Sequence, residues 1–313
     1  MDSPVIAEAV RSGFVESRHR GAFVVLDTDG SPTLRAGDVQ RPVFPRSSAK
    51  PLQAVALVHP VVALAGQTLA ITAGSHEGQP YHVAAVREIL RAAGLDETCL
   101  GTPAALPWPP EPYLRQGGRA RSILMNCSGQ HAAMLAVCVA EGWTTEGYLR
   151  PGHPVQLRVR AALEELTGER TAHLGVDGCG VPVPAFSLLG LARAFQRLAT
   201  APAGTPAAEV AAAMIAHPRF VAGTEGFDTR LMQTVPGLLA KSGAEGMQCV
   251  ALPDGRALAL SVEDGARRAV GPVVAAVLRR LGIAGPEVEA VCRSRLPGAK
   301  TDADEVRATV ALS

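Results

Sequence analysis

The residues best suited to covalent chemistry in this chain are Ser47 and Lys50, in the segment 44–53. Two prolines just ahead of them predict a turn that runs into the first turn of a helix. Residues three apart on a helix share a face, so their side chains can meet. A lysine that is desolvated and neutral part of the time can take the proton of a serine hydroxyl and make it a nucleophile. Ser47 and Lys50 are therefore a candidate nucleophile and base, although this spacing also occurs by chance in many proteins.

Lysine is rare in this chain. Of the 30 Lys and Arg residues, three are lysines (Lys50, Lys241 and Lys300), which leaves 27 arginines. Arginine cannot be deprotonated in a protein and cannot act as a base, whereas lysine can. A lysine that remains in such a chain has a raised chance of being needed for its amine. Lys50 and Lys241 lie among serine and glycine residues, whereas Lys300 is expected to be an ordinary surface residue in a loop.

A second motif, Lys241-Ser242-Gly243, gives the first one a partner. A Ser-x-x-Lys on a helix, followed later by Lys-Ser/Thr-Gly beside a strand, is the two-part signature of serine β-lactamases and penicillin-binding proteins. In that arrangement the second lysine faces the nucleophile across a cleft and supplies positive charge. Both motifs occur here in the expected order, and a strand pattern follows Gly246.

Three other glycine-bearing segments interrupt the apolar pattern, at 74–78, 126–131 and 177–179. Ser75, followed by a histidine, has the residue type of a helix cap as well as that of a reactive hydroxyl. Asp177 has two interpretations, a ligand for a polar group or the closing residue of an Asx turn. His131 heads an apolar helix pattern, a position more typical of a structural histidine than of a base.

The six cysteines do not form the dense pattern of a disulfide scaffold and indicate a reduced, cytoplasmic protein. Cys127 and Cys179 lie in separate glycine-rich loops, where they are either small buried hydrophobic residues or a pair of zinc ligands. No Cys-x-x-Cys or His-x-x-x-His spacing supports the second interpretation. The other four cysteines lie in apolar stretches and are expected in the core.

Composition excludes several classes of function. The chain has 313 residues, 47% of them hydrophobic, with a formal net charge of +1 and scattered basic residues, so no nucleic-acid partner is indicated. The amino terminus lacks the basic start and apolar run of a signal peptide. Because no run of about 18 apolar residues occurs, no membrane span is expected.

The elements that must position these residues follow from periodicity. Strands are predicted at 5–8, 23–26, 247–252, 257–262 and 306–312, and residues 17–21 are expected to join the first two. Helices are predicted throughout the middle of the chain, and the proline-rich stretch 101–118 is expected to be a loop. The pattern predicts one α+β domain over residues 1–313. Terminal strands form an antiparallel sheet, the middle forms a helical lobe, and the site lies between them.

Five segments together resemble one known family, the Rhizobium etli-type L-asparaginases, which are the thermolabile and inducible asparaginase II group. The resemblance runs in unbroken order from about residue 5 to about residue 262, through the motifs PRSSAKP (45–51), SHEG (75–78), NCSGQH (126–131), VDGCGVP (176–182) and KSGAEG (241–246). It implies a fold similar to serine β-lactamases and glutaminases, a homodimer, and hydrolysis of L-asparagine to L-aspartate and ammonia. No organic cofactor is implied.

The resemblance also implies site residues. Two Ser–Lys pairs carry the family's chemistry, and by motif position these are Ser47 with Lys50 and Ser75 with Lys241. The family's zinc is held by two cysteines, which match Cys127 and Cys179, and by a lysine, whose position is Gln130 here. An amide oxygen is a weaker zinc ligand than an amine or imidazole. This replacement places zinc binding in question, and the chemistry expected here does not require it.

The expected reaction follows from these assignments. Lys50 takes the proton of Ser47, which attacks the side-chain amide carbonyl, while Ser75 relays protons or orients the amide. Candidates for holding the α-carboxylate and α-ammonium of the substrate are Arg46, Asn126 and Asp177. Two alternatives remain open at this level, a glutaminase or other small amidohydrolase, and a non-catalytic amino-acid-binding relative.

Overall fold

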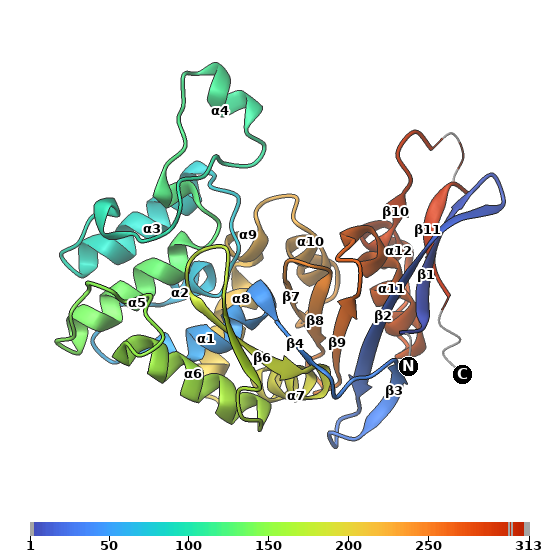
Figure 1. Ribbon diagram of the computed structural model, residues 1–313, viewed down its shortest axis with the longest axis horizontal. Coiled ribbons are helices and arrows are strands. Elements are labelled where there is room, and N and C mark those ends of the chain that lie inside the picture. The colour runs from blue at the N-terminus through green and yellow to red at the C-terminus, as the bar shows by residue number, and fades with distance from the viewer. Residues whose placement is uncertain (1–2, 300, 302, 310–313) are drawn as a thin grey trace.

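A computed structural model describes residues 3–299, 301 and 303–309 as an α+β fold (Figure 1). Within these residues an eight-stranded antiparallel sheet runs in the order β10-β11-β1-β2-β9-β8-β7, and β3 pairs with β2. The strands are β1 (Val5–Arg11), β2 (Phe14–Leu26), β3 (Pro32–Ala36), β7 (Leu239–Ser242), β8 (Met247–Ala251), β9 (Ala257–Val262), β10 (Ser294–Arg295) and β11 (Glu305–Ala308). Both ends of the chain therefore build the sheet, and the predicted α+β class is confirmed.

The long strand β2 corrects one prediction. Residues 17–21 were expected to join two strands, but they lie inside β2, which pairs with β1 through its first half and with β9 through its second. Exposure alternates along these residues, and their charged side chains face solvent. The polarity of residues 17–21 therefore reflects the solvent-exposed face of a strand and not a turn. At Gly21 a Cβ would lie 2.3 Å from the carbonyl oxygen of Ser261, so only glycine allows β9 to approach.

The helices come mainly from the middle of the chain and gather beside the sheet (Figure 1). Helix α5 is almost wholly buried, which explains its apolar sequence, and it packs against α3 and α2. Helix α7 packs against β2, β8 and β9, and α11 packs against β1 and β11. The bounds are α1 (Lys50–Leu57), α2 (Gly66–Thr72), α3 (Pro80–Ala92), α4 (Glu111–Arg115), α5 (Ser128–Ala140), α6 (Pro154–Thr167), α7 (Leu188–Ala199), α8 (Pro206–Ala216), α9 (Pro218–Ala222), α10 (Phe227–Thr234), α11 (Val270–Arg280) and α12 (Pro286–Cys292).

Short elements lie within or beside two stretches that were predicted as loops from their proline or glycine content. The stretch 101–118 contains the short helix α4, because proline is tolerated in the first turn of a helix. The glycine-bearing segment 177–179 was expected in a loop, and it does form the turn of a hairpin in a small sheet with the order β4-β6-β5, where β4 is Pro42–Val43, β5 is His173–Val176 and β6 is Pro182–Ser187. Pro182 and Pro184, in the first half of β6, obscure its strand pattern. The hairpin between β5 and β6 carries Asp177 and Cys179.

Two further expectations concern the ends of elements. Lys241 precedes the hairpin of β8 and β9, as predicted, and it lies on a further strand that was not predicted, β7, opposite Cys249 of β8. The terminal strand was predicted over 306–312, and β11 ends at Ala308. Its last predicted residues and Lys300 lie outside the described residues. No helix in the described part of the chain is long and apolar enough to cross a membrane.

Candidate active site

Lys50 lies at the centre of the candidate site, as the first residue of α1, and only 2% of it is exposed. Its Nζ lies 2.7 Å from the carbonyl oxygen of Gly74, 3.1 Å from Ser75 Oγ and 3.3 Å from the carbonyl oxygen of Asn126. A charged ammonium can donate one hydrogen to each of these oxygens. A neutral amine can donate to the two carbonyls and accept from the Ser75 hydroxyl with its lone pair. The surroundings of Lys50 thus satisfy both protonation states.

Ser75 owes its position to backbone bonds rather than to a helix. Its N–H donates to the carbonyl of Val221 at 2.7 Å, and the next N–H, of His76, donates to Asn126 at 3.1 Å. The helix-cap interpretation of Ser75 was wrong, because α3 begins later, after the N-cap Gln79. Burial holds the pKa of the His76 imidazole well below its ordinary value, and its Nε2 contacts Ser128 Oγ at 2.8 Å. His76, which follows Ser75 in the chain, is therefore a neutral residue with a structural role.

Ser47 lies in the 3₁₀ turn η1 (Arg46–Ala49) ahead of α1, half-buried. Its hydroxyl has no hydrogen-bond partner among the described residues, so the hydroxyl bonded to Lys50 is that of Ser75 and not that of Ser47. The Ser47 N–H also has no acceptor within the described ranges, and the same is true of the exposed Ala244 N–H. A Cβ on Gly243 would lie 2.5 Å from the Pro45 carbonyl oxygen and 3.2 Å from the Ser48 nitrogen. The absence of a side chain at Gly243 therefore lets the segment after β7 lie directly against the Ser47 turn. The N–H groups of Ser47 and Ala244 thus belong to neighbouring segments.

Lys241 is fully buried on β7. Its Nζ donates to the carbonyl oxygen of Ser242 at 2.8 Å and lies 3.6 Å from Oδ2 of Asp228. Burial lowers the pKa of Lys241 to about 8, the Asp228 carboxylate opposes this, and the charge of Lys50 lowers it further. The two lysines are thus electrostatic neighbours. The structure gives no hydrogen bond between Lys241 and Ser75 in its described part.

Asp228 is a residue that sequence reasoning missed. It lies in the first turn of α10, where an aspartate is common because it faces the positive end of the helix dipole. Nothing in the sequence distinguishes it from such a residue. The signal is tertiary, since its carboxylate is fully buried and binds β7.

Arg46 and Asp177, both predicted to bind substrate, form an ion pair with each other. Arg46 Nη2 lies 2.9 Å from Asp177 Oδ1, and both side chains remain partly exposed. Arg46 has a φ of +52° and Glu245 a φ of +58°, so two of three such non-glycine residues in the described chain border the site. Backbone strain of this kind costs on the order of 1–3 kcal/mol and often marks functional positions. The predicted Asn126 contributes its backbone oxygen to Lys50, while its Oδ1 accepts from the Cys127 thiol at 3.0 Å.

The two cysteines of the expected zinc site do come together. The Cys179 thiol contacts Cys127 and lowers the pKa of the Cys127 thiol despite its burial. Correspondingly, that contact and burial raise the pKa of Cys179. Both thiols lie close enough to Lys50 for its charge to affect them.

The remaining donors do not complete a zinc shell. The Gln130 amide donates to Gln53 Oε1 in a buried pair. His131 contacts Tyr148 Oη at 2.7 Å through Nδ1, its Nε2 has no partner, and burial lowers its pKa to about 3. Among the described residues no group of three His, Cys, Asp or Glu side chains is placed to hold a metal ion. Two thiols supply half of a tetrahedral zinc shell, so these residues alone do not fit the metal that the resemblance implies.

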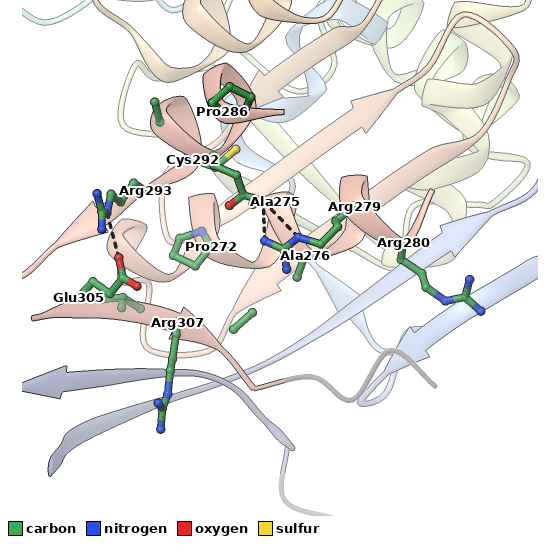
Figure 2. A pocket seen from close by; sticks show the side chains of 14 residues that line it. Pro272, Ala275, Ala276, Arg279, Arg280, Pro286, Cys292, Arg293, Glu305 and Arg307 are labelled. Carbon is green, nitrogen blue, oxygen red and sulfur yellow. Dashed lines mark hydrogen bonds and ion pairs between the residues drawn. The ribbon is translucent and has the colours of Figure 1, made fainter. Parts of the chain in front are cut away.

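The larger cavities lie outside the Ser–Lys cluster. One of about 990 Å³ is lined by Phe44, Arg46 and Glu245 and borders the entrance to the site. Another, of about 860 Å³, lies at the far edge of the sheet between α11, α12 and β11, and is lined by several arginines (Figure 2). Arg293 pairs there with Glu305 at 3.0 Å, as Figure 2 shows, and Arg279 pairs with Glu289 at 3.2 Å. No serine or lysine of the described chain lines this second cavity, and burial raises the pKa of its one thiol, Cys292, to about 12, so it is not the candidate active site.

This chain is similar to several solved structures at low sequence identity. The chain is similar to a β-lactamase from Mycobacterium bovis, with 16% identity, a TM-score of 0.47 and coverage of 89% of this chain and 96% of that one. It is similar to a Bacillus glutaminase, with 12% identity, a TM-score of 0.39 and coverage of 84% and 91%. It is also similar to Mglu in its native form, with 16% identity, a TM-score of 0.47 and 84% coverage, and it spans 63% of that longer chain. A comparison with curated proteins gives no match.

The family comparison is the more extensive. The model of the L-asparaginase II family matches residues 7–309, nearly the whole chain. It does not separate the Rhizobium etli-type group from the rest of the family, so membership of that group stays a prediction. The chain belongs to the L-asparaginase II family, and this membership supports an amidohydrolase.

Proposed function

We propose that this protein is an L-asparagine amidohydrolase that releases L-aspartate and ammonia by Ser–Lys nucleophilic catalysis. The observation that carries the proposal is the position of Lys50 Nζ, 3.1 Å from Ser75 Oγ and held by two backbone carbonyls. A general base must lie within hydrogen-bond reach of the proton that it takes. Lys50 meets this condition for the hydroxyl proton of Ser75.

Ser47 is the proposed nucleophile, because its partly exposed hydroxyl has no partner among the described residues and its own N–H is free. Its oxygen attacks the carbon of the side-chain amide. The oxyanion receives hydrogen bonds from the N–H groups of Ser47 and Ala244, and such paired amide donors are the usual means of stabilising a tetrahedral intermediate.

Ser75 is the proposed relay between the nucleophile and the base. The proton of Ser47 passes to the oxygen of Ser75 as the proton of Ser75 passes to Lys50, and the reverse transfer delivers a proton to the departing ammonia. Water then attacks the aspartyl ester with the same relay. Lys241, across the site on β7, supplies positive charge near the lysine base.

Substrate binding is assigned to the residues at the entrance. Arg46 and Asp177 carry opposite charges, are partly exposed and lie 2.9 Å apart, so a zwitterionic amino acid can pair its α-carboxylate with one and its α-ammonium with the other. Asn126, which is exposed, is the third candidate and offers an uncharged amide. A single catalytic domain, a homodimer and a cytoplasmic location remain predictions from the sequence.

The test is ammonia release from L-asparagine by purified Ser47→Ala, Lys50→Ala and Lys241→Ala proteins. We expect each to lose at least about 100-fold in kcat, in line with the loss of a general base or an oxyanion donor. Near-native turnover in all three would refute the proposed chemistry. Ser48→Ala is a matched control in the same turn, because the Ser48 hydroxyl donates to the Pro45 carbonyl at 2.7 Å and does not contact Lys50.

Two further measurements distinguish the roles of Ser47 and Ser75 and show which amino acid is the preferred substrate. Trapping of a covalent acyl-enzyme in Ser75→Ala but not in Ser47→Ala is expected, and the opposite pattern would exchange the roles of the two serines. Glutamine is assayed beside asparagine. Faster turnover of glutamine would make the protein a glutaminase with the same catalytic groups, and binding of either amino acid without turnover would make it a binding protein.

A further inference from the structure

Asp228 has a fully buried carboxylate. Its contacts are with β7, which carries Lys241, and with the neighbouring strand β8. Its Oδ2 accepts from the Ser242 N–H at 2.8 Å and from Ser242 Oγ at 2.8 Å, and it lies 3.6 Å from Lys241 Nζ. Its Oδ1 accepts from Gln248 Nε2, on β8, at 3.1 Å. One carboxylate on α10 thus binds two successive residues of β7 and one of β8. A buried charge is tolerated when it is paired and hydrogen-bonded in this way.

These contacts lie at the point where β7 approaches the proposed nucleophile. Ser242 is followed by Gly243, whose Cα lies so close to Pro45 and Ser48 that no Cβ fits, and then by Ala244, whose N–H is free within the described chain. A shift of Ser242 would therefore move the proposed oxyanion donor. Asp228 is the group that holds both the backbone and the side chain of Ser242.

We propose that Asp228 is a positioning residue of this site, which holds the end of β7 against the Ser47 turn and supplies the counter-charge of Lys241. The inference rests on the proposed amidohydrolase function and extends it to a residue outside the five motifs. Asp228 acts through Ser242 and Lys241 and does not itself touch the substrate.

The charges around Lys241 support the role of Asp228 as its counter-charge. The groups that face it are Asp228 on α10, Lys50 on α1, Arg267 on η4 (Arg267–Ala269) and Cys127 ahead of α5. Burial, Lys50 and Arg267 lower the pKa of Lys241, whereas Asp228 is the larger of the two groups that raise it. Without the Asp228 charge, the pKa of Lys241 must fall below its value of about 8, and Lys241 would lose its proton closer to neutral pH.

The experiment uses the full-length Asp228→Asn protein, which keeps the size of the side chain and removes its charge. The kinetic readout is ammonia release from L-asparagine across the pH range. We expect kcat to fall at least about 10-fold with KM changed less than about threefold, and the alkaline limb of the kcat profile to move at least about one pH unit toward acid. Asp228→Glu, which keeps the charge, should restore most of the alkaline limb. Asp254→Asn, which removes an exposed carboxylate on the turn between β8 and β9, should behave as the unmodified protein.

A second readout needs no activity. Because the chain contains three lysines, selective ¹³C labelling of lysine gives three resonances, which Lys300→Arg and Lys50→Arg assign by elimination. We expect Asp228→Asn to lower the pKa of Lys241 by at least about one unit, and an unchanged titration would overturn the inference. If the unmodified protein releases no ammonia, the proposed function fails while this titration still decides the link between Asp228 and Lys241.

A milder variant covers the case in which Asp228→Asn does not fold. Ser242→Ala removes one of the contacts to Asp228 and leaves the carboxylate charge in place. We expect kcat to fall about threefold to tenfold, with an unchanged alkaline limb. An unchanged kcat in Ser242→Ala would overturn the positioning role.

Discussion

The two buried lysines of this site share a residue type and a neighbourhood, but their partners differ in kind. Lys50 contacts two backbone carbonyls and a hydroxyl, all uncharged. Lys241 contacts the carbonyl of Ser242 and lies 3.6 Å from the carboxylate of Asp228. Uncharged acceptors satisfy an amine and an ammonium alike, whereas a buried carboxylate favours the ammonium. The difference supports Lys50 as the residue that exchanges a proton with Ser75, and Lys241 as a positive charge that Asp228 helps to retain up to about pH 8, to which burial lowers its pKa.

Substitution by arginine at position 50 is expected to have the largest effect. Arginine keeps the positive charge but cannot lose its proton, so Lys50→Arg should reduce kcat by about 10³-fold, as for loss of a general base. The measurement is ammonia release, with Lys300→Arg as the matched control at the lysine outside the described residues. Retention of more than a tenth of the activity in Lys50→Arg would show that Lys50 acts only through its charge.

The same substitution at position 241 should be tolerated better. Lys241→Arg keeps the charge beside Asp228, and we expect it to retain roughly a tenth of the activity or more. Lys241→Met removes the charge and should reduce kcat by about 100-fold, the usual scale for one electrostatic stabiliser. Equal kcat values in the two variants would contradict a role based on charge. Thermal unfolding of both proteins separates this effect from loss of the fold.

Titration of Lys241 should also appear in stability. Its pKa is about 8 in the folded protein against an ordinary value of 10.5, so the unfolded chain binds this proton more strongly. Below about pH 8 the lysine is protonated in both states, and between about pH 8 and 10.5 its contribution to the free energy of unfolding rises by up to about 3 kcal/mol. Urea unfolding at about pH 8 and about pH 10 measures this change. The gain should be absent from Lys241→Met, and a gain of equal size in that variant would assign it to other groups.

The smallest effect is expected from a metal chelator. Because Cys127 and Cys179 lack a third His, Cys, Asp or Glu donor among the described residues, prolonged chelation should change ammonia release by less than about twofold. The companion variant is Gln130→Lys, which places at position 130 the lysine that the family resemblance implies. Loss of activity in the chelated unmodified protein, reversed by added zinc, would contradict the prediction.

Local pattern predicted much of the fold because burial and period leave their mark on short segments. The helix that was predicted to follow the prolines ahead of Ser47 is α1, and the strands that were predicted at 247–252 and 257–262 are β8 and β9. The failures occur where polarity or proline has two meanings. Arg18 on the wet face of β2 resembles a loop residue, and Pro182 at the start of β6 obscures a strand.

The sequence by itself determined which residues are candidates for the chemistry. Lysine scarcity singled out Lys50 and Lys241, and the five motifs named Ser47, Ser75 and the two cysteines. Residue type is a local property, so it can be read without coordinates.

Only the tertiary structure decided which of these residues meet. Lys50 contacts Ser75, which lies 25 residues away, and Lys241 lies beside Asp228, which no motif contains. The physical reason is that two side chains three residues apart on a helix are able to meet, but the helix alone does not bring them into contact. Its partner is set by whichever buried acceptors the packing of other elements brings within hydrogen-bond distance.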